Sequence, residues 1–155
     1  MKNKRIIMKS VFVGLIFFSL ILISCNNSGK NENTSNKNPI EISDVWMRAG
    51  NLNRNTAAFF NITNNTEMKD TLFNVSSDLA KEVQIHETYS RGEDMKGMRH
   101  VDFVVIEPHS TFEFHPDGYH IMFIGLNKDL TKGETGKMIL HFKNNGSINI
   151  KAEVK

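Results

Sequence analysis

The sequence has a single cysteine, Cys25, among its 155 residues. A lone cysteine excludes disulfide bonds within the chain, and it excludes a zinc site built from cysteine ligands. Long apolar runs are equally scarce, because after residue 23 no apolar stretch approaches the length of a membrane-spanning helix. What remains is long enough for one domain with a real hydrophobic core and too short for two ordinary domains.

The sequence also lacks a strong excess of charge. Its formal net charge is +2, and four of its 19 lysines and arginines lie in residues 1–24, which contain no acidic residue. The rest of the chain therefore has 15 basic and 17 acidic residues, a formal charge of −2. Proteins that bind nucleic acid present a basic surface to the phosphates. We therefore exclude nucleic acid as a partner.

Residues 1–24 have the pattern of a bacterial signal peptide. Four positive charges in residues 1–10 precede the apolar residues 11–23, as in a secretory signal. The following Leu-Ile-Ser-Cys, which ends at Cys25, resembles the lipobox of bacterial lipoproteins, where the cysteine is lipidated and becomes the mature N-terminus. An uncleaved signal anchor is the alternative. We expect a protein of the cell envelope, held to a bacterial membrane by lipid on Cys25 and facing the periplasm or the exterior.

Residues 25–39 continue as a polar tether. After Cys25 the run NNSGKNENTSNKNP contains no apolar side chain that could be buried. Such a segment cannot offset the entropy cost of ordering, so it is expected to be flexible. The folded domain is therefore predicted to span residues 40–155.

From residue 40 onward, apolar residues alternate with polar ones or form short runs between turn signals. This pattern predicts nine strands, at residues 42–47, 56–63, 70–75, 82–86, 99–106, 111–114, 119–126, 137–142 and 148–154. Val101, Phe103 and Val105 are predicted to share one face of their strand. The predicted fold class is all-β, an antiparallel Greek-key β-sandwich of the cupredoxin-like kind.

Two histidines and two methionines stand at positions that allow them to converge. His120 and Met122 are two residues apart on a predicted strand, so their side chains project from the same face. His86 ends another predicted strand, and Met98 lies in the predicted connection after it. Alone, each of these residues has an ordinary structural interpretation, because methionine fills gaps in protein cores and histidine often bonds to backbone.

Together, two imidazoles and two thioethers favour Cu(I). Thioether sulfur is a soft, neutral ligand that prefers Cu(I) to zinc or to hard cations. Thioethers also suit an oxidising compartment, where thiolates form disulfides or oxidise further. Met95 is a possible substitute for Met98, and His100 is a possible supporting group beside the ligands. His109, His115 and His141 are expected to face solvent.

The spacing of these four residues, H-x(11)-M-x(21)-H-x-M from His86 to Met122, resembles the motif of the periplasmic copper chaperones of the PCuAC family. The similarity covers nearly the whole domain, including residues 46–49 (WMRA), residues 57–64 (AAFFNITN) and, most clearly, residues 116–126 (PDGYHIMFIGL). Two features of some members are absent: no methionine follows His86, and no histidine- and methionine-rich tail follows the domain.

The resemblance implies a monomeric, cupredoxin-like Cu(I) carrier rather than an enzyme, with His86, Met98, His120 and Met122 as the metal ligands. It further implies a copper acceptor protein as partner. Members pass copper toward the binuclear copper centre of cytochrome c oxidase subunit II, sometimes alongside thioredoxin-like Sco proteins.

Other functions remain to be weighed against this one. A copper scavenger or buffer, serving copper tolerance or uptake, would use the same site. An electron-transfer cupredoxin needs a cysteine thiolate with two histidines, and Cys25 lies outside the predicted domain. A hydrolytic metalloenzyme is disfavoured because the sequence has no H-E-x-x-H motif and soft sulfur ligands are poor at activating water. A metal-free adhesive sandwich is the remaining alternative.

Overall fold

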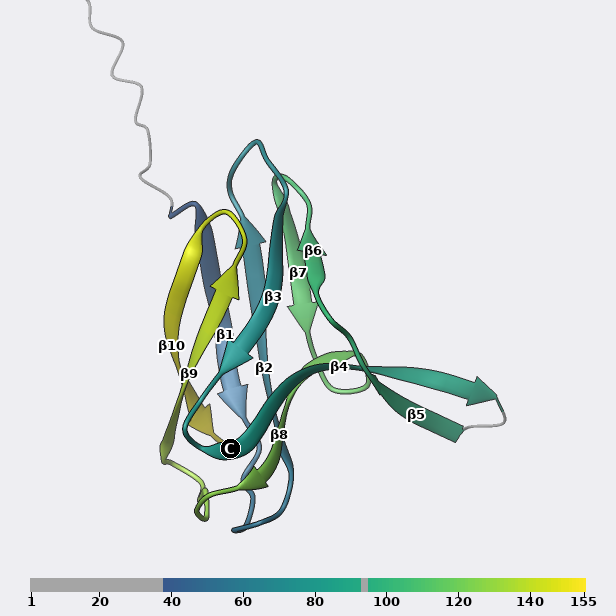
Figure 1. Ribbon diagram of the computed structural model, residues 1–155, viewed down its shortest axis with the longest axis vertical. Coiled ribbons are helices and arrows are strands. Elements are labelled where there is room, and N and C mark those ends of the chain that lie inside the picture. The colour runs from purple at the N-terminus through teal and green to yellow at the C-terminus, as the bar shows by residue number, and fades with distance from the viewer. Residues whose placement is uncertain (1–37, 93–94) are drawn as a thin grey trace, which may run out of the picture. The chain divides into compact units, whose positions relative to one another are not determined.

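The computed structural model describes residues 38–92 and 95–155, and these residues form an all-β domain (Figure 1). The strands of the described part are β1 (Ile40–Met47), β2 (Thr56–Asn64), β3 (Asp70–Ser76), β4 (Ala80–Gly92), β5 (Met95–His100), β6 (Val104–Ile106), β7 (Ser110–Phe114), β8 (Tyr119–Leu126), β9 (Thr135–Phe142) and β10 (Gly146–Val154). The all-β prediction is confirmed. Cys25 and the predicted signal peptide lie outside the described residues.

The strands follow one hydrogen-bonded path, β5-β4-β8-β2-β1-β10-β9-β3-β6, and β7 pairs with β2 beside it. Figure 1 shows β3, β9 and β10 in front of β1 and β2, so the path curls into the two layers of a cupredoxin-like sandwich. Neighbouring strands are antiparallel except β1 and β10, which run parallel. The sheet is therefore mixed, whereas the sequence predicted a purely antiparallel one.

The core lies between the two layers and follows the period of two that the sequence shows. On β9 the buried hydrophobic residues are Met138, Leu140 and Phe142, and on β10 they are Ile150, Ala152 and Val154. These side chains meet the buried faces of β2 and β8 in one hydrophobic cluster. Burying one large apolar side chain stabilises the fold by about 1.5–3 kcal/mol, so this cluster holds the two layers together.

One predicted strand is wrong. The sequence predicted a continuous strand over residues 99–106, but β5 ends at His100 and β6 begins at Val104. Between them the chain leaves β4, the partner of β5, and joins β3, the partner of β6. Because of this crossing, the side chains do not alternate as one continuous strand would. Val104 is buried, whereas Phe103, predicted to share a face with Val101 and Val105, is 55% exposed.

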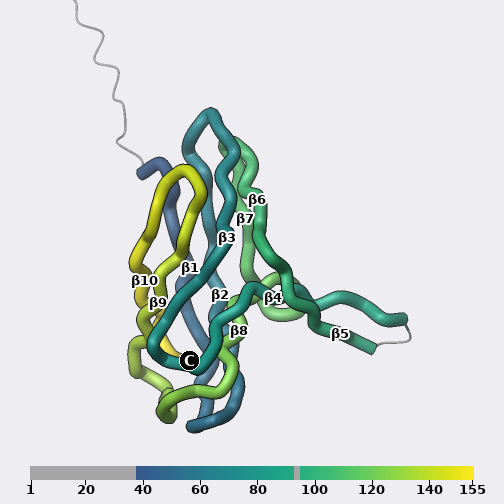
Figure 2. The backbone as a smooth tube through the Cα atoms, in the orientation of Figure 1, coloured from purple at the N-terminus to yellow at the C-terminus, as the bar shows by residue number. Residues whose placement is uncertain are grey.

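The β4–β5 hairpin extends away from the two layers as an arm (Figures 1 and 2). The first half of β4, up to Glu87, pairs with β8, and the part from His86 onward pairs with β5. His86 therefore lies where both pairings overlap.

In the part of the chain that the structure describes, no helix is long and apolar enough to cross a membrane.

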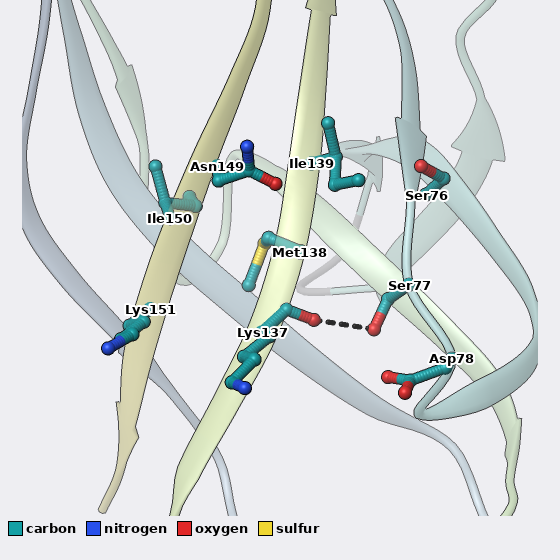
Figure 3. Close-up of a pocket in the computed structure, with 9 residues that line it drawn as sticks. All are labelled: Ser76, Ser77, Asp78, Lys137, Met138, Ile139, Asn149, Ile150 and Lys151. Atoms are coloured by element: carbon teal, nitrogen blue, oxygen red, sulfur yellow. Dashed lines mark hydrogen bonds between the residues drawn. The ribbon is translucent and has the colours of Figure 1, made fainter.

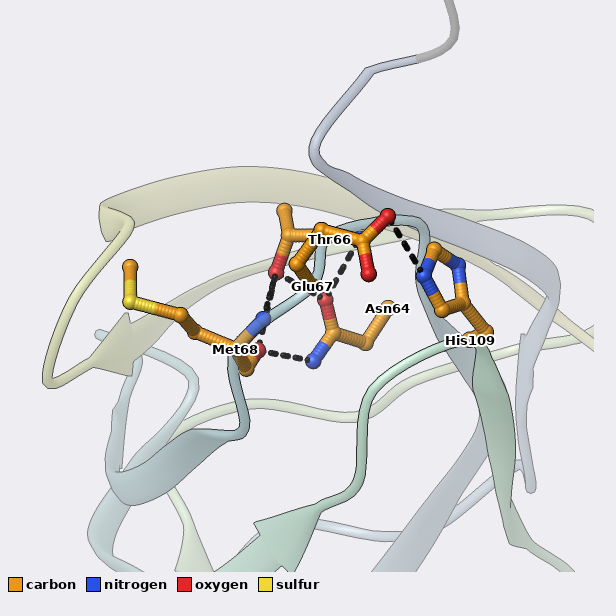
Figure 4. A network of polar contacts seen from close by, with 5 residues as sticks. All are labelled: Asn64, Thr66, Glu67, Met68 and His109. Atoms are coloured by element: carbon orange, nitrogen blue, oxygen red, sulfur yellow. Dashed lines mark hydrogen bonds and ion pairs between the residues drawn. The ribbon is translucent and has the colours of Figure 1, made fainter.

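The last residue of β2 is a buried asparagine, Asn64, which hydrogen-bonds the β2–β3 turn (Figure 4). The side chain of Asn64 is fully buried. Its amide nitrogen donates to the carbonyl of Met68 at 2.8 Å, and its oxygen accepts from the backbone nitrogen of Thr66 at 3.0 Å. These bonds satisfy the buried amide of Asn64, which would otherwise be left unpaired. They fix one end of β2, while the candidate site forms at the other end.

Candidate metal centre

His120 lies at the start of β8, directly after the turn that links β7 to β8. The turn is closed by hydrogen bonds from the backbone nitrogen of Gly118 to His115 O and from His115 N to Tyr119 O. A side chain on Gly118 would collide with the His115 ring, because a Cβ there would lie 2.5 Å from it. His120 is only 3% exposed.

Backbone geometry fixes which nitrogen of His120 is available. Its Nδ1 lies 3.0 Å from the carbonyl oxygen of Gly118, and a carbonyl can only accept. Nδ1 therefore carries the proton, and Nε2 keeps a lone pair. Metal-bound histidines commonly donate their other ring nitrogen to a carbonyl in this manner.

His86 lies directly opposite His120 on the neighbouring strand β4. The two ring centroids are 5.8 Å apart. Two imidazoles that bind one metal through bonds of about 2 Å place their ring centres roughly 5–6 Å apart. The measured separation thus fits a shared metal ion.

One nitrogen of His86 is paired and the other is not. Nε2 lies 2.7 Å from the side-chain oxygen of Gln84. Nδ1 is buried and has no hydrogen-bond partner. An unpaired buried nitrogen is costly, and a bound metal ion would satisfy it.

Burial lowers the pKa of His86 below that of an ordinary imidazole, and the neighbouring rings of His120 and His100 lower it further. The carboxylate of Glu82 raises the pKa of His86, but by less than these effects lower it. His86 is therefore neutral at neutral pH, which is the form that binds metal.

Met122 and Met98 line one cavity of about 220 Å³ together with His120. Met122 shares the face of His120, as the sequence predicted, and lies opposite Gln84 of β4. Met98 is on strand β5 opposite Thr88, and not in a connection as the sequence predicted. It is 61% exposed, so its thioether reaches solvent. His86 is not among the residues that line this cavity.

Aromatic side chains form the apolar side of the cavity. Phe59 of β2 is 2% exposed, and its ring centroid is 6.4 Å from that of His120. Trp46 packs on Phe59 at 4.5 Å, and the guanidinium of Arg48 lies 5.3 Å from the Phe59 ring centroid. Trp46 itself is half-buried.

An ion pair joins the hairpin arm to the turn beside the cavity. Lys96 of β5 contacts Asp117 of the β7–β8 turn, with Nζ and Oδ1 2.8 Å apart. This ion pair lowers the pKa of Asp117. Both side chains are largely exposed, so the pair contributes little energy, but it links the strand of Met98 to the turn that precedes His120.

The two possible supporting residues lie near the site in different ways. His100 is opposite His86 on β5, with ring centroids 6.2 Å apart, and its side chain is 51% exposed. Met95 lines a separate cavity together with Lys96 and Asp117. Among residues 38–92 and 95–155, no three His, Cys, Asp or Glu side chains gather closely enough to hold a metal ion by themselves.

The other histidines make contacts elsewhere. His109 pairs with Glu67 at 3.0 Å and is exposed (Figure 4), and His115 is exposed as predicted. His141 is half-buried rather than solvent-facing, because Ser76 and Ser147 both hydrogen-bond its ring.

A larger cavity of about 530 Å³ lies over β9 and β10, away from the predicted ligands (Figure 3). Ser77 donates to the carbonyl of Lys137 at 2.6 Å along its edge. Its lining mixes the apolar side chains of Met138, Ile139 and Ile150 with lysine, serine and asparagine. None of the four predicted ligands takes part in it.

Sequence reasoning missed the partners of the two histidines. The carbonyl of Gly118 cannot be read from a sequence, because it depends on the turn geometry. The sequence does show that Gln84 shares a face with His86, because residues two apart on a strand point to the same side. The hydrogen bond between the two side chains depends on their conformations, which the sequence does not show.

A protein-family model described as putative lipoprotein LpqE-like matches residues 40–154. A putative lipoprotein of Leifsonia xyli subsp. xyli is 27% identical over 122 residues, which cover 75% of this chain and 69% of that protein.

Two solved structures share the fold. The copper-bound PCuAC domain from PmoF2 superposes with a TM-score of 0.64 at 24% identity, over 76% of this chain and 92% of that domain. The solution structure of the Cu(I) form of DR1885 from Deinococcus radiodurans gives a TM-score of 0.57 at 26% identity, over 74% of this chain and 78% of that one. The domain thus has the fold of PCuAC domains.

Proposed function

The chain belongs to the LpqE-like family of putative lipoproteins, and from this membership and the site we propose that it is an extracytoplasmic Cu(I) chaperone. In this proposal His86, Met98, His120 and Met122 bind one Cu(I), and the protein carries the ion to an acceptor without catalysing a reaction. The observation that carries the proposal is the buried Nδ1 of His86, which has no hydrogen-bond partner. The His86 ring lies 5.8 Å from the ring of His120, and the Nδ1 proton of His120 is held by the carbonyl of Gly118.

The donor set supports copper over other metals. Two neutral imidazoles and two thioethers leave a Cu(I) site with a charge of +1, and thioether sulfur is a poor ligand for zinc or hard cations. The copper-bound PCuAC domain from PmoF2 and the Cu(I) form of DR1885 have the same fold, which supports the same cargo here.

The exposure of Met98 supports transfer rather than storage. A buffer protein gains from a closed site, whereas a carrier must let an acceptor replace its ligands one at a time. Met98 is 61% exposed on an edge strand, so it is the ligand that an acceptor can displace first. His120, in contrast, is nearly fully buried and would release the ion last.

The acceptor that we propose is the binuclear copper centre of cytochrome c oxidase subunit II. We also propose that acylated Cys25 anchors the protein to the membrane, which keeps the carrier near a membrane-bound acceptor. The lipoprotein character of the family and of the Leifsonia relative supports the anchor.

The test is an anaerobic titration of the full chain with Cu(I), in competition with a chromophoric chelator, followed by X-ray absorption. We expect one Cu(I) per chain and sulfur scattering in the first shell. A first shell of only nitrogen and oxygen, or no uptake, would contradict the proposal. Mixing two equivalents of the loaded chain with the metal-free copper domain of subunit II then tests delivery: after separation of the two proteins, metal analysis should find the copper on the acceptor. One-electron oxidation of the filled centre with ferricyanide should then develop its visible absorption.

A further inference from the structure

Gln84 contacts His86 in a way that selects one form of the imidazole ring. The two residues are two positions apart on β4, so their side chains share one face of the sheet. The Gln84 side-chain oxygen lies 2.7 Å from Nε2 of His86. Both side chains are half-buried, so water competes weakly for this bond.

Glu82, two residues further back on the same face, sets the direction of the Gln84 amide. The amide nitrogen of Gln84 donates to the carboxylate of Glu82. An ionised carboxylate can only accept hydrogen bonds, so the NH₂ group must face Glu82. The amide oxygen is thereby turned toward His86, and because an oxygen only accepts, Nε2 of His86 must carry the proton.

The consequence falls on the other nitrogen of the ring. With the proton on Nε2, the lone pair of the neutral imidazole is on Nδ1. Nδ1 is the one buried side-chain polar atom of the described residues that lacks a hydrogen-bond partner. His120 has the opposite arrangement, because its Nδ1 donates to Gly118 and leaves Nε2 free.

We propose that Gln84 is a positioning residue of the copper site: it holds the His86 proton on Nε2, so that Cu(I) binds to Nδ1 of His86 and to Nε2 of His120. This inference rests on the proposed function. Gln84 touches no metal in this scheme. It acts through His86, and Glu82 acts through Gln84.

A contact of this kind stabilises a metal site in two ways. It keeps the ring in one orientation before the metal arrives, and it raises the basicity of the ligating nitrogen. Changing such a partner typically lowers metal affinity by about 10- to 100-fold. Gln84 also lies opposite Met122 across β4 and β8, so one residue adjoins two of the four proposed ligands.

The experiment compares the full-length wild-type chain with Gln84→Leu and Gln84→Glu. Leucine removes the acceptor at similar size, and glutamate keeps an oxygen that can accept from Nε2. Lys81→Leu, on the opposite face of β4, is the control for a surface change on the same strand. Long-range ¹H–¹⁵N correlation spectra of the imidazoles report the proton positions, with and without Cu(I), and chelator competition gives the affinities.

We expect the wild-type His86 ring to carry its proton on Nε2 before Cu(I) is added. Cu(I) should then shift the Nδ1 resonance of His86, while the proton remains on Nε2. Gln84→Leu should distribute the proton over both nitrogens and lower the Cu(I) affinity about tenfold or more. Gln84→Glu should restore the single tautomer and most of the affinity, whereas Lys81→Leu should leave both unchanged. A merely structural role for Gln84 would not move the proton.

Two results would overturn the inference while leaving the proposed function intact. One is Cu(I) binding in which the His86 Nε2 proton is lost. The other is a Gln84→Leu chain with the wild-type tautomer and affinity. Failure of the wild-type chain to bind Cu(I) would instead overturn the proposed function, and the copper part of the inference with it.

Discussion

His86 and His120 face each other across the pairing of β4 with β8, with their ring centroids 5.8 Å apart. In the same register Gln84 lies opposite Met122. The site therefore depends on strand pairing as much as on the ligands themselves. A slip of one residue between β4 and β8 would turn one set of side chains to the other face of the sheet.

The pKa of His86 gives the first prediction, which concerns pH. Protons compete with Cu(I) for the imidazoles, so copper affinity falls as pH is lowered. Burial lowers the pKa of His86, so this imidazole stays neutral to a lower pH than an ordinary histidine, whose pKa is about 6.5. Cu(I) affinity should therefore be nearly constant above about pH 6.5 and fall in more acidic solution. Chelator competition between pH 4 and 8 measures this, and an affinity that decays already from pH 8 would contradict it.

A buried carboxylate gives the second prediction, which concerns stability. Asp70 is 1% exposed and accepts hydrogen bonds from the backbone nitrogens of Asn144 and Asn145 and from the Asn145 amide. Burial alone would raise the pKa of Asp70, but these bonds, with one from Thr71, outweigh it and hold the pKa below its usual range. The stabilisation is thus complete above about pH 4 and lost as pH falls through the lowered pKa.

Asp70→Asn should lower the free energy of unfolding by about 1–3 kcal/mol at pH 7, because the new amide turns an NH₂ group toward donors. Urea unfolding measures the change. Asp78→Asn is the matched control, since Asp78 is exposed and should change stability by less than about 0.5 kcal/mol. Equal losses in both variants would show that the buried acceptor is not the cause.

The fold could be predicted where a simple alternation of residues continues along a strand. Residues 137–142 and 148–154 were predicted as strands and form most of β9 and β10, up to the last residue of each, because each buries one face against the same core. The prediction failed over residues 99–106, where the chain passes from one layer to the other. Local sequence has no signal for such a crossing, since Val101, Phe103 and Val105 alternate as a strand would.

The four candidate ligands could be named from their spacing, but their surroundings could not. The parity of His120 and Met122 was enough to place both on one face. The buried ring of His120 lies 6.4 Å from the ring of Phe59, which is 61 positions away in sequence. The orientation of each imidazole depends on a turn carbonyl and on an amide, and these follow from tertiary structure alone.

Lipid attachment gives the third prediction. Because Cys25 follows Leu-Ile-Ser, Cys25→Ser should abolish labelling with a radioactive fatty acid and release or misprocess the protein. Two or more acyl chains hold a protein firmly to a membrane, whereas a single chain binds weakly and reversibly. Membrane fractionation provides the second readout. The control is Ser28→Ala in the tether, which lies outside the Leu-Ile-Ser-Cys motif and should be labelled normally. Membrane attachment of the wild type without any lipid label would contradict the prediction.

Methionine substitutions give the fourth prediction, because they separate ligand from packing roles. Met→Leu nearly conserves volume and usually costs less than about 1.5 kcal/mol in a core, yet it removes the sulfur. Met122→Leu should therefore leave the urea midpoint nearly unchanged and lower Cu(I) affinity at least about tenfold. Met98→Leu should also weaken binding, unless Met95 moves in from its neighbouring cavity, and the double variant Met95→Leu/Met98→Leu removes that possibility.

Two methionines outside the site are the matched controls for these substitutions. Met138 is 1% exposed in the core and Met68 is 70% exposed in the β2–β3 turn (Figure 4), so they cover both kinds of surroundings. Met138→Leu and Met68→Leu should bind Cu(I) as the wild type does. If Met122→Leu also binds with wild-type affinity while His120→Ala does not, the ion is held by histidine alone. In that case the sulfur of the H-x-M pair packs against Ala57, its neighbour across β2 and β8, and has no part in binding copper.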